Sequence, residues 1–387
     1  MSGYRVLARI ADGLGIPRAW MNLGPADGAG AYPGGVRRRE LTEEQIEEMR
    51  RRAVMAFAGM AFAGRPLGEL GPQPQLPAPA PIPLPSRILV VHVAKVRDLT
   101  RKLRETGRTY GSDPEVSSAT AAWAARLLDI PGAEPVKQAL TAAVAELHLH
   151  AGWAAFDAGL HDRTMHHYTC GLELAIVTGD TYLQATALNY AGLATVEHGR
   201  PNNGLKLLQF GQLIARGIPS DDELARVGWQ GSRAAVQACG QVYSATALSL
   251  MGDPDGADAK LATARELLQS TPADLNSDPD YLVASLELER GRLDAAQPFA
   301  TALARRWESG SQRARTHTSI LLATIHVRAG EPDGLRLAHG AITGVTRLSS
   351  FRARQRLNPL ASALEARPGG DHRQLARMAR DVATTRA

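Results

Sequence analysis

A repeat of glycine turns restricts the fold of this chain more than any other feature of its sequence. The turns DAGLHD, EHGRPN, LMGDPD, ERGRLD and RAGEPD place glycines at positions 159, 199, 252, 291 and 330, at intervals of 40, 53, 39 and 39 residues. Ala-rich apolar segments precede and follow each turn. Small side chains let two helices approach closely, and glycine adopts the left-handed conformation that ends a helix. The repeat therefore predicts five helix pairs stacked into an α-solenoid.

The predicted solenoid occupies residues 86–387 and makes the fold class all-α. Apolar residues three to four positions apart predict a further helix over residues 88–103, before the first pair. Pro201, Pro254 and Pro332 follow glycine turns and are expected in the first turn of a second helix, where a proline loses no hydrogen bond. A stack of this kind has a concave surface along its length.

A proline-rich segment separates the solenoid from a shorter N-terminal region. Residues 71–85, GPQPQLPAPAPIPLP, contain seven prolines, which exclude a helix and predict a polyproline-II spacer. Residues 25–70 are expected to form a loop and a connecting helix. The apolar run at 53–64 is too short to span a membrane and is expected to pack on a neighbouring domain, with a signal sequence starting at Met49 as the alternative.

The formal net charge of +5 is located at the C-terminal end of the chain. Residues 347–387 contain nine arginines and three acidic residues, a net charge of +6. Only five of the 44 basic residues are lysines, a bias typical of GC-rich bacterial genes. The segment from residue 349 onward predicts two short helices that cap the solenoid with a polar outer face. The basic charge is therefore weak support for nucleic-acid binding.

The sequence contains no motif for catalysis or for a cofactor. It lacks G-x-S-x-G, H-E-x-x-H, a P-loop and a strand followed by GxGxxG and a helix. Cys170 and Cys239 are the only cysteines, and their apolar contexts favour core positions. So few cysteines exclude a disulfide framework and indicate a reducing, cytoplasmic location. We expect neither an enzyme nor a cofactor.

Histidines are concentrated around the first glycine turn. Five lie within twenty residues, with Cys170 nearby: His148, His150, His161, His166 and His167. Histidine and cysteine are good zinc ligands, but residues one or two positions apart in a helix point in different directions. We therefore expect interhelical or exposed histidines and no metal site.

The concave surface is the expected place for a ligand, because polar and aromatic side chains on the first helix of each pair would face it. The predicted groove residues are Tyr182, Asn189, Arg233, Gln237 and Arg313. Trp153 and Tyr190 also lie on first helices and are expected to pack inside. The ligand would be a peptide, a small molecule or a protein.

The repeat resembles tetratricopeptide-like arrays, although its period exceeds their usual length of about 34 residues. Residues 145–180, AELHLHAGWAAFDAGLHDRTMHHYTCGLELAIVTGD, look like the first repeat of a bacterial regulator family. That family joins an N-terminal Xre-type helix-turn-helix domain to a tetratricopeptide-like region. Residues 4–20, YRVLARIADGLGIPRAW, look like the fourth helix and tail of such a domain. The resemblance extends from Tyr4 to about residue 350.

This resemblance implies a homodimeric transcriptional regulator with a ligand-sensing repeat region. It implies that residues 1–24 are the C-terminal fragment of a helix-turn-helix domain, and that the helices that read DNA would precede Tyr4. We therefore expect DNA binding only if those helices are restored. Either the true start lies upstream of Met1, or the chain is a remnant without sequence-specific binding. The alternative function is a tetratricopeptide-like interaction scaffold that does not bind DNA.

Several arginines are candidates for phosphate contacts beside a DNA-binding domain. Three of them are Arg37, Arg38 and Arg39, and four lie near the C-terminus: Arg347, Arg352, Arg354 and Arg356. Such contacts give affinity without sequence information. Solvent-exposed helix faces are the alternative explanation for these arginines.

Overall fold

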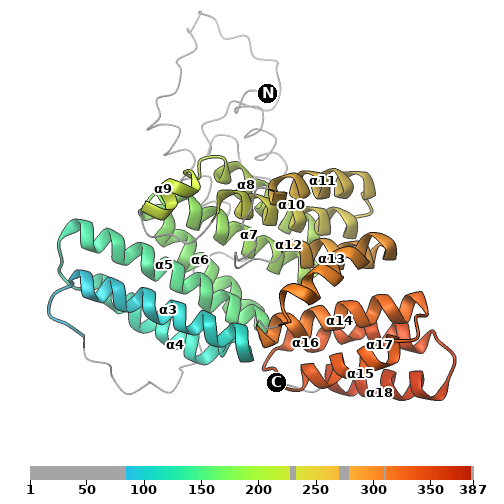
Figure 1. Cartoon of the computed structure of the whole chain (residues 1–387). Coiled ribbons are helices and arrows are strands. Elements are labelled where there is room, and N and C mark those ends of the chain that lie inside the picture. Colours follow the sequence, from blue (N-terminus) through green and yellow to red (C-terminus); the bar gives the residue numbers. More distant parts are fainter. Residues whose placement is uncertain (1–83, 227–231, 270–278, 309–310, 385–387) are drawn as a thin grey trace, which may run out of the picture. The chain divides into compact units, whose positions relative to one another are not determined.

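Helices pack in adjacent pairs throughout the part of the chain that the structure describes (Figure 1). The computed structural model describes residues 84–226, 232–269, 279–308 and 311–384. Within these residues there is no β-strand, apart from an isolated parallel bridge between Ile88 and Gly132. The predicted all-α, solenoid-like fold is confirmed. The predictions for residues 1–24 and 25–70, including the three arginines at 37–39, lie outside the described residues.

In the described part of the chain, two helices precede the first pair. They are α3 (Val90–Tyr110) and α4 (Pro114–Ala125), and α4 continues as a 3-10 turn over Arg126–Asp129. Both pack on α5, the first helix of the first pair. The helix expected at 88–103 is therefore present and is one to two turns longer than its apolar pattern.

The five predicted pairs follow in order. The first two are α5 (Glu134–Asp157) with α6 (His161–Val177), and α7 (Thr181–Glu197) with α8 (Pro201–Ala215). After the short α9 (Asp221–Arg226) come α10 (Arg233–Leu250) with α11 (Pro254–Gln269), α12 (Pro279–Glu289) with α13 (Leu293–Arg306), and α14 (Gln312–Ala329) with α15 (Gly334–Val345).

The C-terminal cap consists of α16 (Phe351–Gln355), α17 (Leu357–Glu365) and α18 (Gly370–Thr384). The sequence predicted two helices in this segment, and the structure has three. Pro359 accounts for the break between α16 and α17, because it has no N–H to donate to the carbonyl of Gln355 four residues earlier. The helices α17 and α18 pack on each other as a further pair.

The glycine turns behave as predicted. Each of the five glycines ends a first helix with φ between 75° and 80°, the left-handed region that glycine adopts without steric cost. Gly179 ends α6 in the same way with φ of 69°, a turn between pairs that the repeat did not reveal. Pro201 and Pro254 begin α8 and α11 as expected. Pro332 does not begin a helix; it lies in the turn before α15.

Short polar side chains fix the N-terminal ends of several helices. Asp113 accepts hydrogen bonds from the backbone N–H groups of Glu115 and Val116 at the start of α4. Asp180 accepts one from Leu183 at the start of α7, and Ser232, Ser311 and Ser350 cap α10, α14 and α16 in the same way. These bonds satisfy N–H groups that have no partner inside the helix.

The first helices of the pairs form a continuous row. In this row α5 contacts α7, α7 contacts α10, α10 contacts α12, and α12 contacts α14. Each second helix packs mainly against the first helix of its own pair. The first helices therefore present one shared face, as expected for a stack of helix pairs.

The C-terminal helices of the array pack against its N-terminal helices. The helix α14 packs on α3, and α16 packs on α5, although these segments are far apart in sequence (Figure 1). The Ser311 hydroxyl donates a hydrogen bond to the carbonyl of Arg108 at the end of α3. The Phe351 ring covers Gly159, where a Cβ atom would lie 2.5 Å from the ring. The C-terminal helices thus close against the first pair.

Glycines set the closest approach between helices. In the pair α7 and α8, a Cβ atom on Gly204 would lie 2.7 Å from the Gly192 carbonyl oxygen and 2.4 Å from a Val196 methyl group. Both helices are buried along this contact. Neither backbone can move away without separating the leucines that pack beside it.

The substitution Gly204→Ala should therefore lower the free energy of unfolding by about 1–3 kcal/mol, since it places a methyl group against backbone. Gly340→Ala is the matched control on α15, because a Cβ atom there meets no atom within 4 Å. It should leave stability unchanged or raise it by up to about 1 kcal/mol through helix propensity. Urea unfolding monitored by circular dichroism compares the two. Equal stability of both variants would contradict the close approach.

Candidate functional site

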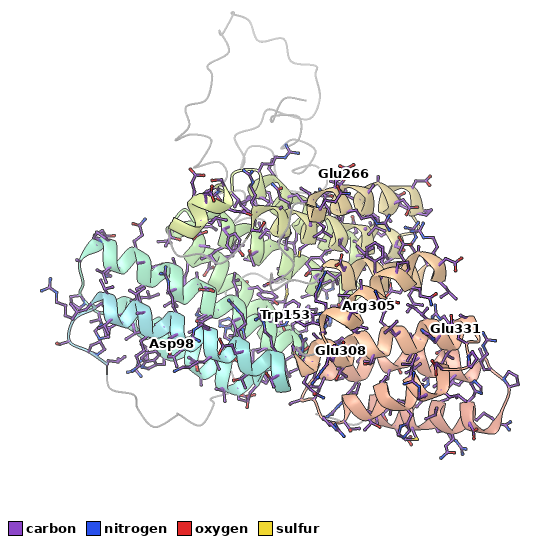
Figure 2. All side chains as sticks on the ribbon, in the orientation of Figure 1. Asp98, Trp153, Glu266, Arg305, Glu308 and Glu331 are labelled. Carbon is purple, nitrogen blue, oxygen red and sulfur yellow. The ribbon has the colours of Figure 1, made fainter. Side chains whose placement is uncertain are left out.

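Arginines and aromatic rings gather where the C-terminal helices meet the first helices. We call this set the closing cluster. It consists of Trp153, Phe156, Asp157, Glu197, Tyr281, Arg313, His317, Arg352 and Arg356. The members come from α5, α7, α12, α14, α16 and the residue that follows α16. Figure 2 labels Trp153 on α5, in the region where that helix approaches the C-terminal helices.

Arg352 is the central member of the closing cluster. Its side chain is buried, and it forms two hydrogen bonds to Glu197, from Nε at 3.0 Å and from Nη2 at 2.5 Å. Its guanidinium lies 4.1 Å from the centre of the Phe156 ring and 5.6 Å from that of Trp153. Burial by itself would lower the pKa of Arg352, but the Glu197 carboxylate raises it above its usual value. Arg352 is therefore a permanent cation held between a carboxylate and two ring faces.

A second ion pair joins α14 to α5. The Arg313 Nη2 atom lies 2.5 Å from Oδ1 of Asp157, whose side chain is 1% exposed. The other carboxylate oxygen of Asp157 and the Nε atom of Arg313 are buried without a hydrogen-bond partner in the described protein. Leaving such groups unpaired costs about 1–3 kcal/mol each. The ion pair thus holds the helices together at some cost in unsatisfied polar groups.

Arg356 contacts a buried histidine and an aromatic ring. Its Nη1 atom lies 3.3 Å from Nδ1 of His317, and its guanidinium lies 4.6 Å from the centre of the Tyr281 ring. Burial, together with Arg356, Arg313 and Arg352, lowers the pKa of His317 well below its usual value. His317 is therefore neutral, and its Nδ1 accepts the hydrogen bond from Arg356. The closing cluster contains three arginines and two carboxylates, and a third carboxylate, that of Glu289, also interacts with Arg356.

A second group of residues continues this surface toward α3. We call it the tyrosine–arginine cluster: Arg104, Arg108, Glu146, Tyr182 and Tyr190. Arg104 pairs with Glu146 at 2.8 Å, and the Tyr190 ring centre lies 5.1 Å from that of Trp153. Burial raises the pKa of Tyr190 to about 12, with a further contribution from Cys239. The tyrosine hydroxyls therefore stay protonated and can donate or accept hydrogen bonds.

Arg108 differs from Arg104 because its side chain forms no ion pair or hydrogen bond among the described residues, although the Glu105 carboxylate lies near enough to raise its pKa. It lies one turn from Arg104 on α3, and its side chain is exposed. Burial by the surrounding protein and the Arg104 charge lower its pKa. A guanidinium near Tyr190 without an ion-pair partner is suited to bind an anionic group of a ligand.

The structure places the predicted groove residues in three different environments. Tyr182 belongs to the tyrosine–arginine cluster and Arg313 to the closing cluster, so these two lie on the shared face. Arg233 is exposed at the start of α10, where its backbone N–H donates to Asp221 at 2.8 Å. Trp153 and Tyr190 were expected to pack inside the array. Both are half-buried on the shared face, so this prediction is only partly met.

Asn189 and Gln237 connect helices instead of facing a groove, which corrects their predicted position. The Asn189 side chain is 2% exposed and donates to the Val236 carbonyl at 2.9 Å. Gln237 is half-buried and donates to the Ala215 carbonyl at 3.0 Å. Gly211 and Gly240 lie against Asn189, and their missing side chains let α8 and α10 cover it.

The structural role of Arg352 has no counterpart in the sequence pattern. Arg352 was a candidate for a phosphate contact, but its side chain is buried and bound to Glu197, 155 residues away in sequence. A contact between residues so far apart leaves no local pattern in the sequence that could predict it. The sequence also gave no indication of the pair formed by Arg104 and Glu146.

The histidines around the first turn are mainly buried contacts between helices. The Nδ1 atoms of His148 and His167 lie 3.1 Å apart, and Nε2 of His167 lies 2.9 Å from the Ser118 hydroxyl. Burial lowers the pKa of His148 to about 4 and that of His167 to about 3, with smaller contributions from neighbouring histidines. One neutral ring therefore donates to the other. Among the described residues, no three histidine, cysteine or acidic side chains are grouped as a metal ion would require.

Cys170 is also unsuited to nucleophilic chemistry in this environment. Its Sγ atom lies 3.7 Å from Nε2 of His166. Burial raises the pKa of the Cys170 thiol to about 11, so the thiol is protonated near neutral pH.

Comparison with protein-family models and with curated proteins found no match for this chain. Across the described ranges, none of the helices has the length and hydropathy of a segment that crosses a bilayer.

Replacing Arg352 with leucine should loosen the contact between α16 and α5. The change removes both hydrogen bonds to Glu197, whose exposed fraction of 37% lets the freed carboxylate turn to water. Amide hydrogen exchange should become at least tenfold faster in α14 and α16, while α7 and α8 exchange as in the wild type. Uniform exchange changes along the chain, or none, would contradict the assigned role of Arg352.

The buried histidines should make stability depend on pH. The pKa of His150 is lowered to about 4 by burial, with a smaller effect from Arg104, whereas an unfolded histidine titrates near 6.5. The unfolded chain therefore binds a proton first, and stability falls as pH drops from about 6.5 toward 4. His150 should contribute about 2 kcal/mol of this loss between pH 7.5 and pH 5.

Urea unfolding at the two pH values measures this loss, and His150→Leu should reduce it. The exposed His339 is the control, since His339→Leu should leave the pH dependence unchanged. A wild-type protein equally stable at both pH values would refute the idea that these rings are neutral and buried.

Proposed function

We propose that this helix array is the sensing domain of a transcriptional regulator of the Xre-plus-tetratricopeptide type. In this proposal a peptide, a small molecule or a protein segment binds the face formed by the first helices. The observation that carries the proposal is the tyrosine–arginine cluster, where Arg108, which forms no ion pair among the described residues, lies near Arg104 and Tyr190. A guanidinium in this position favours a ligand with a carboxylate or another anionic group.

In this proposal, the closing cluster couples ligand binding to the arrangement of the C-terminal helices. Its ion pairs connect α14 and α16 to α5 and α7, and it touches the tyrosine–arginine cluster through Trp153 and Tyr190. A ligand that binds the closed and the open arrangement with different affinity shifts the balance between them. In a dimeric regulator this shift would change the spacing or orientation of the DNA-binding domains.

The binding part of this proposal predicts that Arg108→Glu abolishes ligand retention. The protein purified from its own host under native conditions should carry a bound ligand visible by native mass spectrometry. Arg108→Glu should lose that ligand, because it replaces the unpaired cation with a carboxylate. Arg373→Gln is the control, since Arg373 is exposed on α18, away from the cluster. Equal retention by both variants would exclude the cluster as the binding surface.

The alternative function is an interaction scaffold of the same fold that does not bind DNA. The two functions differ in the coding DNA upstream of the Met1 codon. An in-frame extension that encodes a basic recognition helix supports the regulator, and an in-frame stop codon supports the scaffold. A mobility-shift assay at physiological salt tests this chain directly. Sequence-specific binding by it would contradict the expectation that the DNA-reading helices are missing.

A further inference from the structure

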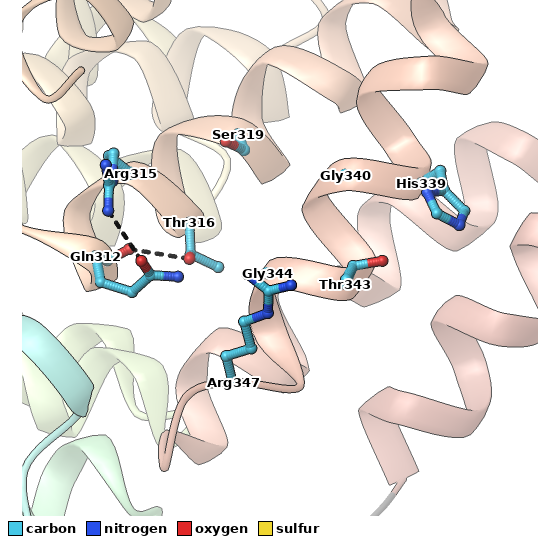
Figure 3. A pocket seen from close by; sticks show the side chains of 9 residues that line it. All are labelled: Gln312, Arg315, Thr316, Ser319, His339, Gly340, Thr343, Gly344 and Arg347. Atoms are coloured by element: carbon cyan, nitrogen blue, oxygen red, sulfur yellow. Dashed lines mark hydrogen bonds between the residues drawn. The ribbon is translucent and has the colours of Figure 1, made fainter. Parts of the chain in front are cut away.

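A groove separate from both clusters lies between α14 and α15 (Figure 3). Its volume is about 490 Å³. Sites for small molecules and cofactors usually have volumes of about 300–1,000 Å³. The groove is therefore large enough for a metabolite and too small for a folded partner.

The floor of this groove is backbone, because two glycines of α15 face it. Gly340 and Gly344 are one helical turn apart, and both line the groove. A Cβ atom at Gly340 would meet no atom within 4 Å, whereas one at Gly344 would lie 3.2 Å from the Thr316 hydroxyl. A side chain at Gly340 would therefore start in open space beside the groove, without a clash at its Cβ atom.

The side chains around the groove are cationic or uncharged. Arg315 and Arg347 lie at one end, His339 lies at the other, and none of the described residues that line the groove carries a carboxylate. Arg315 is held in place by its hydrogen bonds to the Gln312 side chain at 2.9 Å and to the Glu308 carbonyl at 3.1 Å. Arg347 is exposed and has no partner among the described residues, and Figure 3 shows it extending along α15 beside Gly344.

Hydroxyl groups complete the lining of the groove. Ser319 on α14 and Thr343 on α15 both face it, between the arginines and His339. Each hydroxyl can donate one hydrogen bond to an anion. The groove thus combines two guanidinium groups, three hydroxyls, counting that of Thr316, and an imidazole, and no acidic side chain of the described residues lines it.

We propose that this groove binds a small molecule that carries a phosphate or pyrophosphate group. A guanidinium presents its N–H donors in a planar fork that fits two phosphate oxygens at once, and this pairing is stronger than a hydrogen bond between neutral groups. Arg347 binds the phosphate, Arg315 supports it from α14, and the rest of the molecule lies over the glycine floor. This site is independent of the ligand surface on the first helices.

Isothermal titration of the full chain with inorganic pyrophosphate and with ADP tests this assignment at constant ionic strength. Both probes should bind the wild type, and citrate, an anion without phosphate, should bind at least tenfold more weakly. Arg347→Gln should weaken both phosphate probes at least tenfold, whereas the control Arg373→Gln should bind them as the wild type does. No binding of either probe, or equal binding of citrate, would overturn the proposal.

Gly340→Leu tests the location of the site independently of charge. The leucine side chain would occupy the groove floor, and the helix should remain intact because leucine has a higher helix propensity than glycine. This variant should melt at or above the wild-type temperature and lose binding of ADP at least tenfold. A folded Gly340→Leu protein that binds ADP with wild-type affinity would show that the groove is not the site.

Discussion

The packing of each helix pair on the next is the constraint on which the rest of this structure depends. A two-helix unit cannot bury its own apolar surface, so it needs a neighbour on each side. Glycine and alanine make this possible, as at Gly192 and Gly204, where the backbones of α7 and α8 meet without intervening side chains. The row of first helices follows from this stacking, and so does the shared face that carries both clusters.

The return of the C-terminal helices to the first pair introduces a different kind of interaction. Within pairs the buried contacts are mostly apolar, but the contacts of α14 and α16 with α5 and α7 include buried charges. Arg352 and Arg313 each need a carboxylate partner, and Glu197 and Asp157 provide them. Such pairs hold helices in one arrangement and add little net stability, because desolvation offsets much of their attraction. A contact of this kind can shift when a ligand binds beside it.

Much of the fold could be predicted from the sequence because its signals are local. The glycine turns at Gly159 and Gly330, like those between them, mark where one helix must end and the next begin, and the structure has a helix on each side of every one. The break at Pro359 was missed, although a proline without an N–H donor is also a local signal. The positions of side chains on the shared face could be predicted only in part. Tyr182 and Arg313 lie there, but Asn189 does not, since the rotation of α7 depends on glycines in α8 and α10.

The sequence by itself determined that the chain forms stacked helix pairs, where those pairs turn, and which residue types each helix carries. These properties depend on backbone conformation and on apolar spacing over a few residues. Only the tertiary structure decided which charges meet, which histidines are buried and where a groove remains open. Arg352 and Glu197 are 155 residues apart, and their contact exists because the stacked pairs carry α16 back to α5. The position of every helix pair between α5 and α16 determines that contact. No single segment of the sequence encodes it.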